Sequence, residues 1–249
     1  MLFVLCRKRG QQVSQMSDSL GSIVLLPGLD GTSFLFRPLL EHLTLSPVVV
    51  DYPQALPNDY SDLLPTVIDA LPSDRAYILL GWSFSGPLAL MAAATRPAGL
   101  LGIVMCASFV QKPVFYLPSF VRQLARPSLF RYMARLTRVK ALLSGYSTPA
   151  LSTLVARAHA SVPPEVMAQR VRATLTVDVQ PELDSCHVPI LYLGSTRDFV
   201  VPRRNARRIL RSRADVRAVF IPGPHLALAV NPKEAASALG AFAKAVGAE

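Results

Sequence analysis

A serine at position 83 stands in the segment LLGWSFSGP (79–87), where an aliphatic run passes through a turn of small residues into an alanine-rich stretch. Such a turn between a strand and a helix holds its central serine in a strained backbone conformation, and its small neighbours let strand and helix approach closely. The hydroxyl then projects at the helix N-terminus, where developing negative charge is stabilised. We therefore predict that Ser83 is a nucleophile, with an ordinary Gly/Ser turn as the alternative.

A serine nucleophile needs a base and an acid that orients the base, and both residue types stand just beyond later aliphatic runs. Asp198 follows the run at 190–193, and His225 follows the run at 216–221. We predict that His225 is the general base and Asp198 its orienting acid. The simpler alternatives are a helix-capping aspartate and a loop histidine. The other three histidines lie in a predicted helix, in a long insertion or before a strand, and none follows a strand: His42, His159 and His187.

Short aliphatic runs alternate with helical patterns along most of the chain. The expected strands cover 22–26, 48–50, 76–80, 102–107, 190–193 and 216–221, and the expected helices cover 34–45, 60–71, 87–95, 203–213 and 232–246. Strands separated by helices imply right-handed crossovers, so we predict an α/β fold with a mostly parallel, doubly wound sheet. Ligands bind at the carboxyl ends of the strands in such sheets, and the three candidate catalytic residues all follow strands.

The alternation stops between residues 110 and 186, where the pattern is helical, polar and basic without a clear strand. We interpret 110–186 as a helical cap inserted over the carboxyl ends of the strands. The core is then expected to comprise residues 16–109 and 187–249. Residues 1–15 are expected to be an N-terminal extension of unknown role, because Met16 opens a more ordinary start.

The chain from about residue 22 to 246 resembles the α/β-hydrolase superfamily of serine hydrolases, in the manner of a carboxylesterase with a helical cap. The resemblance rests on four segments: PGLDG at 27–31, GWSFSG at 81–86, GSTRDFVVP at 194–202 and PGPHLALAVNP at 222–232. The chain departs from the family in three respects: Pro27-Gly28 stands where His-Gly is frequent, Ser85 replaces a glycine, and residues 1–20 do not accommodate two further strands common there.

The resemblance implies that Ser83, His225 and Asp198 form a catalytic triad. It also implies that the backbone N–H groups of Leu29 and Phe84 form the oxyanion hole. Trp82, beside the nucleophile, is a candidate for contact with the substrate. The expected activity is hydrolysis of a small or medium-chain carboxylic ester through an acyl-enzyme, with no cofactor and no metal.

Two other functions remain open at this stage. The same site would serve a thioesterase or an acyltransferase that acts on carrier-bound acyl groups. A non-catalytic ligand-binding protein that keeps the fold is the alternative from another class, although the presence of all three triad residues argues against it. No Gly-x-Gly-x-x-Gly or Walker A sequence occurs, so nucleotide binding has no support.

The chain has 26 basic and 16 acidic residues, a net charge of +10. The segment 110–175 contains ten basic residues and one acidic residue. The segment 203–217 contains seven arginines and one aspartate. One hypothesis is that this charge attracts an acidic partner such as an acyl carrier protein; the alternative is a set of ordinary solvated basic faces. Nucleic-acid binding is disfavoured, because no recognition motif accompanies the charge.

Nothing in the sequence predicts a membrane or secreted protein. The uncharged stretch between Arg75 and Arg96 is interrupted by glycines and a proline, so no membrane span is expected. The apolar residues 1–6 precede their basic cluster, the reverse of a signal peptide. The three cysteines form no Cys-x-x-Cys and are too few for a disulfide framework. We expect a cytoplasmic protein.

Overall fold

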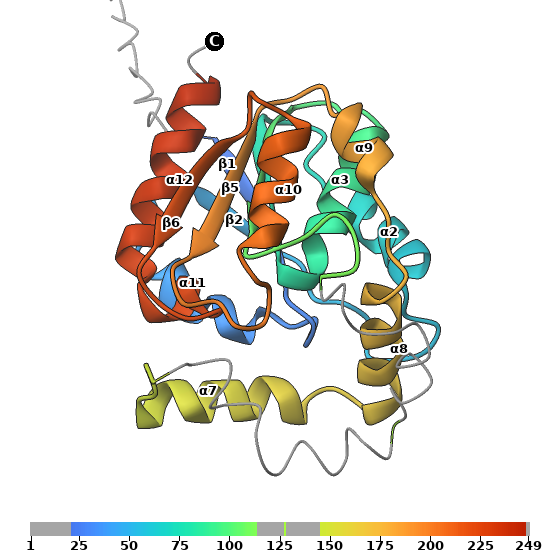
Figure 1. Cartoon of the computed structure of the whole chain (residues 1–249), viewed down its shortest axis with the longest axis vertical. Helices are drawn as coiled ribbons and strands as arrows, with labels where there is room; N and C mark the ends of the chain where they lie inside the picture. The colour runs from blue at the N-terminus through green and yellow to red at the C-terminus, as the bar shows by residue number, and fades with distance from the viewer. Residues whose placement is uncertain (1–20, 114–126, 128–144, 248–249) are drawn as a thin grey trace, which may run out of the picture.

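The computed structural model describes residues 21–113, 127 and 145–247, and Figure 1 shows how their helices and strands are arranged. Six strands form one sheet in the order β2-β1-β3-β4-β5-β6, and every neighbouring pair is parallel. The strands are β1 Ser22–Leu26, β2 Ser46–Val49, β3 Tyr77–Trp82, β4 Leu100–Cys106, β5 Ile190–Ser195 and β6 Arg217–Ile221. The predicted doubly wound α/β fold is confirmed.

Helices cover both faces of the sheet (Figure 1). One face packs against η1 Ser33–Phe36, α1 Arg37–Leu40, α11 Ala227–Val230 and α12 Pro232–Gly247. The other face packs against α2 Tyr60–Asp69, α3 Gly86–Ala94, α9 Gln180–Asp184 and α10 Arg204–Ser212. The core therefore consists of two apolar layers separated by the sheet.

The central strand β1 explains why its sequence is a continuous aliphatic run. Its side chains point alternately to the two faces, so Ile23 and Leu25 join one apolar layer while Val24 and Leu26 join the other. All four side chains are fully buried. A strand that is covered on both faces needs apolar residues at every position, which is the usual pattern of a parallel sheet with helices on both sides.

The helix expected over 34–45 is shorter than the spacing suggested. The chain forms the 3-10 turn η1 and then the four-residue α1, and Pro38 lies in the first turn of α1. Proline has no N–H and its ring clashes with the preceding turn, so it is disfavoured in the interior of a helix and tolerated in the first turn. The helix expected over 60–71 tolerates Pro65 and spans 60–69. The sequence pattern gave no sign of the short helix α11.

Two helices of the region between 110 and 186 lie beyond the carboxyl ends of the strands, where β5 points in Figure 1. They are α7 Pro149–Ala160 and α8 Pro164–Thr174. The end of the same region instead belongs to the sheet's second layer, because Val179 and Leu183 pack there beside α3. Residues 114–126 and 128–144 lie outside the described part of the chain, so the limits of the predicted cap stay a prediction. Among the described helices, none is both long and apolar enough to cross a membrane.

Candidate active site

The turn that follows β3 places Ser83 in a conformation that few non-glycine residues adopt. Its φ is +52°, in the left-handed region, which costs an L-residue on the order of 1 kcal/mol or more. Gly81 allows the approach of strand and helix, because a Cβ atom there would lie only 2.8 Å from the Cα of Gly86. The hydroxyl of Ser108 donates to the carbonyl of Ser83 at 2.6 Å and fixes the turn from β4's side. This is the strained turn predicted from the sequence.

Ser85, which replaces a glycine of the usual pattern, connects this turn to the loop after β1. Its side chain is fully buried, and its hydroxyl donates to the carbonyl of Pro27. Since that bond uses the only proton of the hydroxyl, Tyr52 is the donor in the 2.6 Å hydrogen bond between its phenol and Ser85 Oγ. Burial raises the pKa of Tyr52, so the phenol keeps the proton that it donates. A glycine at position 85 would leave both partners unsatisfied.

Hydrogen bonds link Ser83 to His225 and His225 to Asp198. The Nε2 atom of His225 lies 2.8 Å from Ser83 Oγ, and its Nδ1 atom lies 2.8 Å from Asp198 Oδ2. A carboxylate only accepts, so Nδ1 carries the ring proton and Nε2 is left to accept from the serine hydroxyl. The side chains of His225 and Asp198 are 5% and 3% exposed. The geometry is that of a nucleophile, a base and an orienting acid.

Backbone groups hold Asp198 in place. Its Oδ1 atom accepts from the N–H groups of Val200 at 2.9 Å and Val201 at 2.8 Å, which leaves Oδ2 for the imidazole. The loops that carry Asp198 and His225 are also joined directly, because Arg197 N–H donates to the carbonyl of Gly223 at 2.8 Å. The acid and the base therefore sit on one rigid unit at the carboxyl ends of β5 and β6.

The loop PGLDG, residues 27–31, is held through its carbonyl groups. Each of its five carbonyls accepts a hydrogen bond, and the donors come from five different residues: Ser85 Oγ to Pro27, Gly31 N at 2.9 Å to Gly28, Arg170 Nη1 at 3.0 Å to Leu29, Gln54 Nε2 at 3.4 Å to Asp30, and Tyr52 N at 2.8 Å to Gly31. No described group accepts from the N–H of Leu29. Phe84 N–H lies in the first turn of η2 Ser83–Ser85, where helical N–H groups have no partner within the helix. Both are therefore available to a substrate oxygen.

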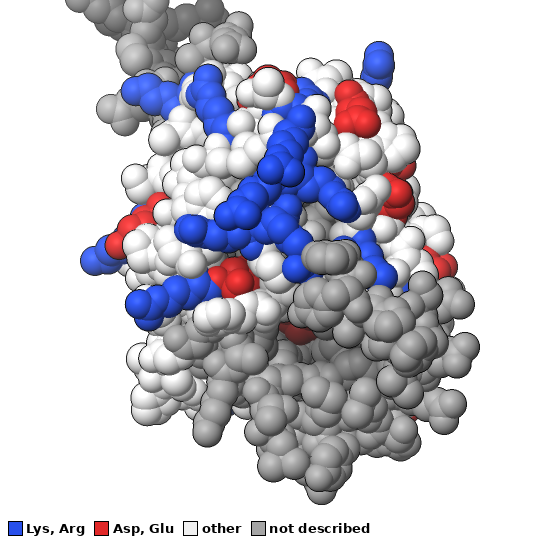
Figure 2. Space-filling model, viewed as in Figure 1, with Lys and Arg blue, Asp and Glu red and all other residues white. Residues whose placement is uncertain are grey.

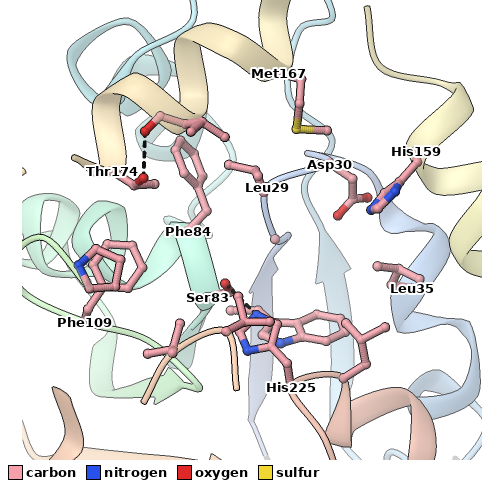
Figure 3. A pocket seen from close by; sticks show the side chains of 17 residues that line it. Leu29, Asp30, Leu35, Ser83, Phe84, Phe109, His159, Met167, Thr174 and His225 are labelled. Atoms are coloured by element: carbon pink, nitrogen blue, oxygen red, sulfur yellow. Dashed lines mark hydrogen bonds between the residues drawn. The ribbon is translucent and has the colours of Figure 1, made fainter. Parts of the chain in front are cut away.

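A cavity of about 330 Å³ lies above these groups (Figure 3). Its floor includes Ser83 and His225, and Leu29 and Phe84 line it as well. Helices α7 and α8 contribute His159, Met167, Val171 and Thr174 to the wall. Most of the remaining lining is apolar: Leu35, Trp82, Phe109, Pro113, Val200, Val201 and Leu226. Such a lining suits the hydrocarbon part of a small ligand.

Comparison with known proteins agrees with this geometry. A model of the alpha/beta hydrolase family matches residues 23–238. The chain belongs to the α/β-hydrolase family. This hydrolase is 28% identical over 201 residues, 73% of its own chain and 75% of the other, to the pimeloyl-[acyl-carrier protein] methyl ester esterase of Shewanella sp. (strain MR-7).

Solved structures resemble the fold of this hydrolase. A thermophilic esterase from Thermogutta terrifontis has a TM-score of 0.76 at 17% identity, with 90% of each chain covered. A lipase-esterase related protein from Clostridium acetobutylicum ATCC 824 has a TM-score of 0.74 at 16% identity, with 90% of this chain and 95% of the other covered. At such identities the likeness shows the fold, while the activity of this hydrolase has to be argued from its own residues.

The structure brings all six predicted site residues of the hydrolase to one cavity: Leu29, Trp82, Ser83, Phe84, Asp198 and His225, of which Asp198 lies behind the imidazole. Trp82 is only 2% exposed and packs against Phe36 with a centroid distance of 5.3 Å. The side chain of Trp82 therefore forms part of the cavity wall. Among the described residues, no group of three or more His, Cys, Asp or Glu side chains could hold a metal ion.

The sequence pattern missed Arg170, which α8 brings into the hydrolase core. The side chain is fully buried and donates to Asn58 Oδ1 at 2.6 Å, to the Leu29 carbonyl at 3.0 Å and to the Pro53 carbonyl at 3.1 Å. Its guanidinium also lies 5.6 Å from the ring centre of Tyr52. Burial lowers the pKa of Arg170 to about 10, so it stays charged at neutral pH. In the sequence it is one of ten basic residues of 110–175, with nothing to distinguish it.

Asp30 is a second buried titratable side chain of the hydrolase, and it belongs to the same loop as Leu29. Burial raises its pKa, against the lowering effect of hydrogen bonds from the N–H and hydroxyl of Thr32 and of the charge on Arg170. A carboxyl with a raised pKa binds its proton more tightly when folded. Its contribution to stability is therefore complete below the ordinary value near 3.8 and is lost as the pH rises through the raised pKa.

We expect this loss to disappear in Asp30→Asn, which keeps an oxygen acceptor without a titratable group. The free energy of unfolding of the wild type, relative to that of the variant, is expected to fall between pH 4 and pH 7.5, by about 1.4 kcal/mol for each unit by which the pKa is raised. Urea unfolding at both pH values measures the difference. A difference that is constant with pH, or that moves in favour of the wild type, would contradict the assignment.

Proposed function

We propose that this protein is a serine hydrolase of carboxylic esters, in which Ser83 is the nucleophile, His225 the general base and Asp198 its orienting acid. The observation that carries the proposal is the unbroken pair of 2.8 Å hydrogen bonds that joins the three side chains at the floor of an apolar cavity. A serine hydroxyl is a weak nucleophile until such a base removes its proton.

In the first half of the proposed reaction, Ser83 Oγ attacks the carbonyl carbon of the ester while its proton passes to His225 Nε2. The N–H groups of Leu29 and Phe84 stabilise the negative charge that develops on the carbonyl oxygen. Asp198 stabilises the imidazolium ion. The bond to the leaving oxygen then breaks, the imidazolium gives its proton to that oxygen, and the alcohol departs. The acyl group remains on Ser83 as an ester.

Water completes the cycle. His225 removes a proton from the water, whose oxygen attacks the acyl carbonyl carbon, and the same two N–H groups stabilise the second oxyanion. The bond between the acyl carbon and Ser83 Oγ breaks, and Ser83 recovers its proton from the imidazolium. The products are a carboxylic acid and an alcohol, and the enzyme returns to its starting state.

The size of the cavity favours a small or medium-chain acyl group as the part of the substrate bound there. Its volume of about 330 Å³ is at the lower end of the range for ligand pockets. We include α7 and α8 in the proposed cap, because four side chains from these helices close the cavity opposite Ser83. One of them, Met167, is a flexible side chain from α8 that reaches the cavity (Figure 3).

A chain-length profile tests this proposal. For p-nitrophenyl esters from acetate to laurate, kcat/KM is expected to peak at a short or medium chain and to be at least about tenfold lower for laurate. Met167→Ala shortens a side chain in the wall, so the peak is expected to move to longer chains. Met91→Ala, at a half-buried methionine outside the cavity, is the matched control. An unchanged profile in Met167→Ala would remove this cavity as the acyl site.

A carrier-bound ester is a second candidate substrate. It is favoured by the similarity to an esterase that acts on pimeloyl-[acyl-carrier protein] methyl ester, and by the excess of positive charge on this chain.

Acyl transfer is an alternative to hydrolysis at the same site. Transfer of the acyl group to an alcohol or thiol would use the same acyl-enzyme. Product analysis with an added alcohol separates the two reactions, because a transferase forms the new ester while a hydrolase forms the free acid.

A further inference from the structure

A groove with a strongly basic lining runs along α10. Figure 2 shows the cluster of Lys and Arg side chains over this helix. The groove has a volume of about 550 Å³, and its lining contains five cations and two neutral polar residues: Lys112, Arg204, Arg207, Arg208 and Arg211, with Asn205 and Ser212. We call these seven residues the α10 groove. None of the described residues that line it is acidic.

Two of the five cations of the α10 groove, Arg207 and Arg211, are not neutralised by an acidic side chain of the described residues. Arg213, just beyond the helix, pairs with Asp215, but neither Arg207 nor Arg211 has a carboxylate within ion-pair distance among the described residues. Both are exposed. They lie four residues apart on one helix, and such a pair of like charges destabilises a helix. A bound anion would remove this repulsion.

The first turn of α10 adds to the imbalance. It contains no acidic residue, and Arg203 and Arg204 stand at the N-terminus of the helix, where the macrodipole favours negative charge. The opposite face of the same helix is conventional, because Ala206 and Ile209 are buried in the second apolar layer. The side chains of Arg207 and Arg211 lie outside this apolar layer and are exposed, so a partner can reach them.

The α10 groove lies next to the active-site cavity. The carbonyl of Pro113 accepts hydrogen bonds from Arg204 Nη2 at 3.0 Å and from Asn205 Nδ2 at 3.1 Å. Pro113 is also part of the cavity lining, as are Val200 and Val201 just before the helix. Pro113 thus connects the lining of the cavity to two residues of the groove by hydrogen bonds, and a partner bound in the groove would lie near the cavity.

We propose that the α10 groove docks the acidic face of a protein that carries the ester substrate into the adjacent cavity. This inference rests on the proposed function. α10 has nine residues, and its basic face is therefore about 14 Å long, which matches about two turns of an acidic helix. The position of the groove beside the cavity gives a substrate-bearing protein a reason to bind there, whereas nucleic acid or an anionic membrane would gain nothing from it. Complementary charge would increase the rate of association, and salt would reduce this increase by screening the attraction.

The test compares two charge-reversal variants on two substrates. Arg207→Glu/Arg211→Glu alters the groove, and Lys233→Glu/Lys244→Glu makes the same net charge change on exposed positions of α12, on the opposite face of the sheet. The substrates are p-nitrophenyl butyrate and pimeloyl-[acyl-carrier protein] methyl ester. For the carrier-bound ester at low salt, we expect the groove variant to lose at least about tenfold in kcat/KM, and this loss to shrink at about 0.5 M salt. Its activity on p-nitrophenyl butyrate and both activities of the α12 variant are expected to stay within about twofold of the wild type.

Several outcomes would overturn the inference. The groove variant could keep full activity on the carrier-bound ester, or could lose both activities together, which would indicate damage to the site. The wild type could hydrolyse only p-nitrophenyl butyrate; the proposed function would then stand while the docking partner would be wrong. Tighter binding of double-stranded DNA or of anionic lipid vesicles than of the carrier, lost in the same variant, would assign the groove to those ligands. Absence of both activities in the wild type would instead contradict the proposed function.

Discussion

Replacing Ser83 with alanine is expected to lower kcat for p-nitrophenyl butyrate by at least about 10⁴-fold while the protein stays folded. Loss of a triad serine in an enzyme of this kind removes the covalent route, and only the weaker contribution of the oxyanion hole and of substrate binding remains. The variant should also relieve little strain, because alanine adopts the left-handed conformation of position 83 no more easily than serine. We therefore expect a thermal unfolding midpoint within a few degrees of the wild type.

Steady-state kinetics and a fluorophosphonate probe measure this effect independently. The probe should label the wild type once per chain and should not label Ser83→Ala. Ser73→Ala, at an exposed serine outside the site, is the control and should keep both activity and labelling. Full turnover by Ser83→Ala would exclude Ser83 as the nucleophile. Absence of both turnover and labelling in the wild type would revive the interpretation of a non-catalytic binding protein.

The fold and the three positions of the proposed triad could be predicted from the sequence because their signals are local. A buried parallel strand must be apolar at each position, as β1 is, and a strained turn needs small residues around it, as Gly81 and Gly86 provide. Parallel strands bring their carboxyl ends to one edge, so residues after β3, β5 and β6 were expected to meet there. The structure places Ser83, His225 and Asp198 within hydrogen-bonding distance at that edge.

The contacts around the site could not be predicted from the sequence, because they join segments that are far apart in the chain. Ser85 was expected only to be small enough for its turn, yet it donates to a carbonyl 58 positions away. Arg170 contacts a carbonyl 141 positions away, and its residue type predicts a solvated surface. Helix length was also predicted wrongly at 34–45, where the apolar spacing continues beyond Leu40, the last residue of α1. A pattern of residue types does not specify which distant acceptor a donor meets.

Replacing Arg170 with methionine is expected to lower kcat by about 10- to 100-fold, with KM changed by less than about threefold. Arg170 is proposed as a positioning residue: it holds the Leu29 carbonyl, and the N–H of Leu29 is a proposed donor to the oxyanion. Removing one such donor costs about 10²–10³ in kcat, so misplacing it should cost somewhat less. Substrate binding depends mainly on the cavity wall and should change little. Arg157→Met, at an exposed arginine on α7, is the matched control and should keep both constants.

A second measurement separates positioning from simple loss of stability. A trifluoromethyl ketone forms an oxyanion with the active-site serine and so depends on the same N–H groups as the transition state. Across the wild type, Arg170→Lys and Arg170→Met, its inhibition constant is expected to rise in proportion to the fall in kcat/KM. Lysine can donate to the Leu29 carbonyl but lacks the planar fork that reaches Asn58 and Pro53 as well, so Arg170→Lys should lie between the other two.

If the inhibition constant of the ketone stays constant across these variants, Arg170 has a purely structural role. In that case Arg170→Met would lose stability in urea, and the fraction of enzyme that the fluorophosphonate probe can titrate would fall, while kcat per titrated site and the affinity for the ketone would match the wild type. The proposed role has a wider consequence, because Arg170 belongs to α8 while its acceptors belong to the loops after β1 and β2. The position of the Leu29 N–H group therefore depends on the position of α8 as well as on its own loop.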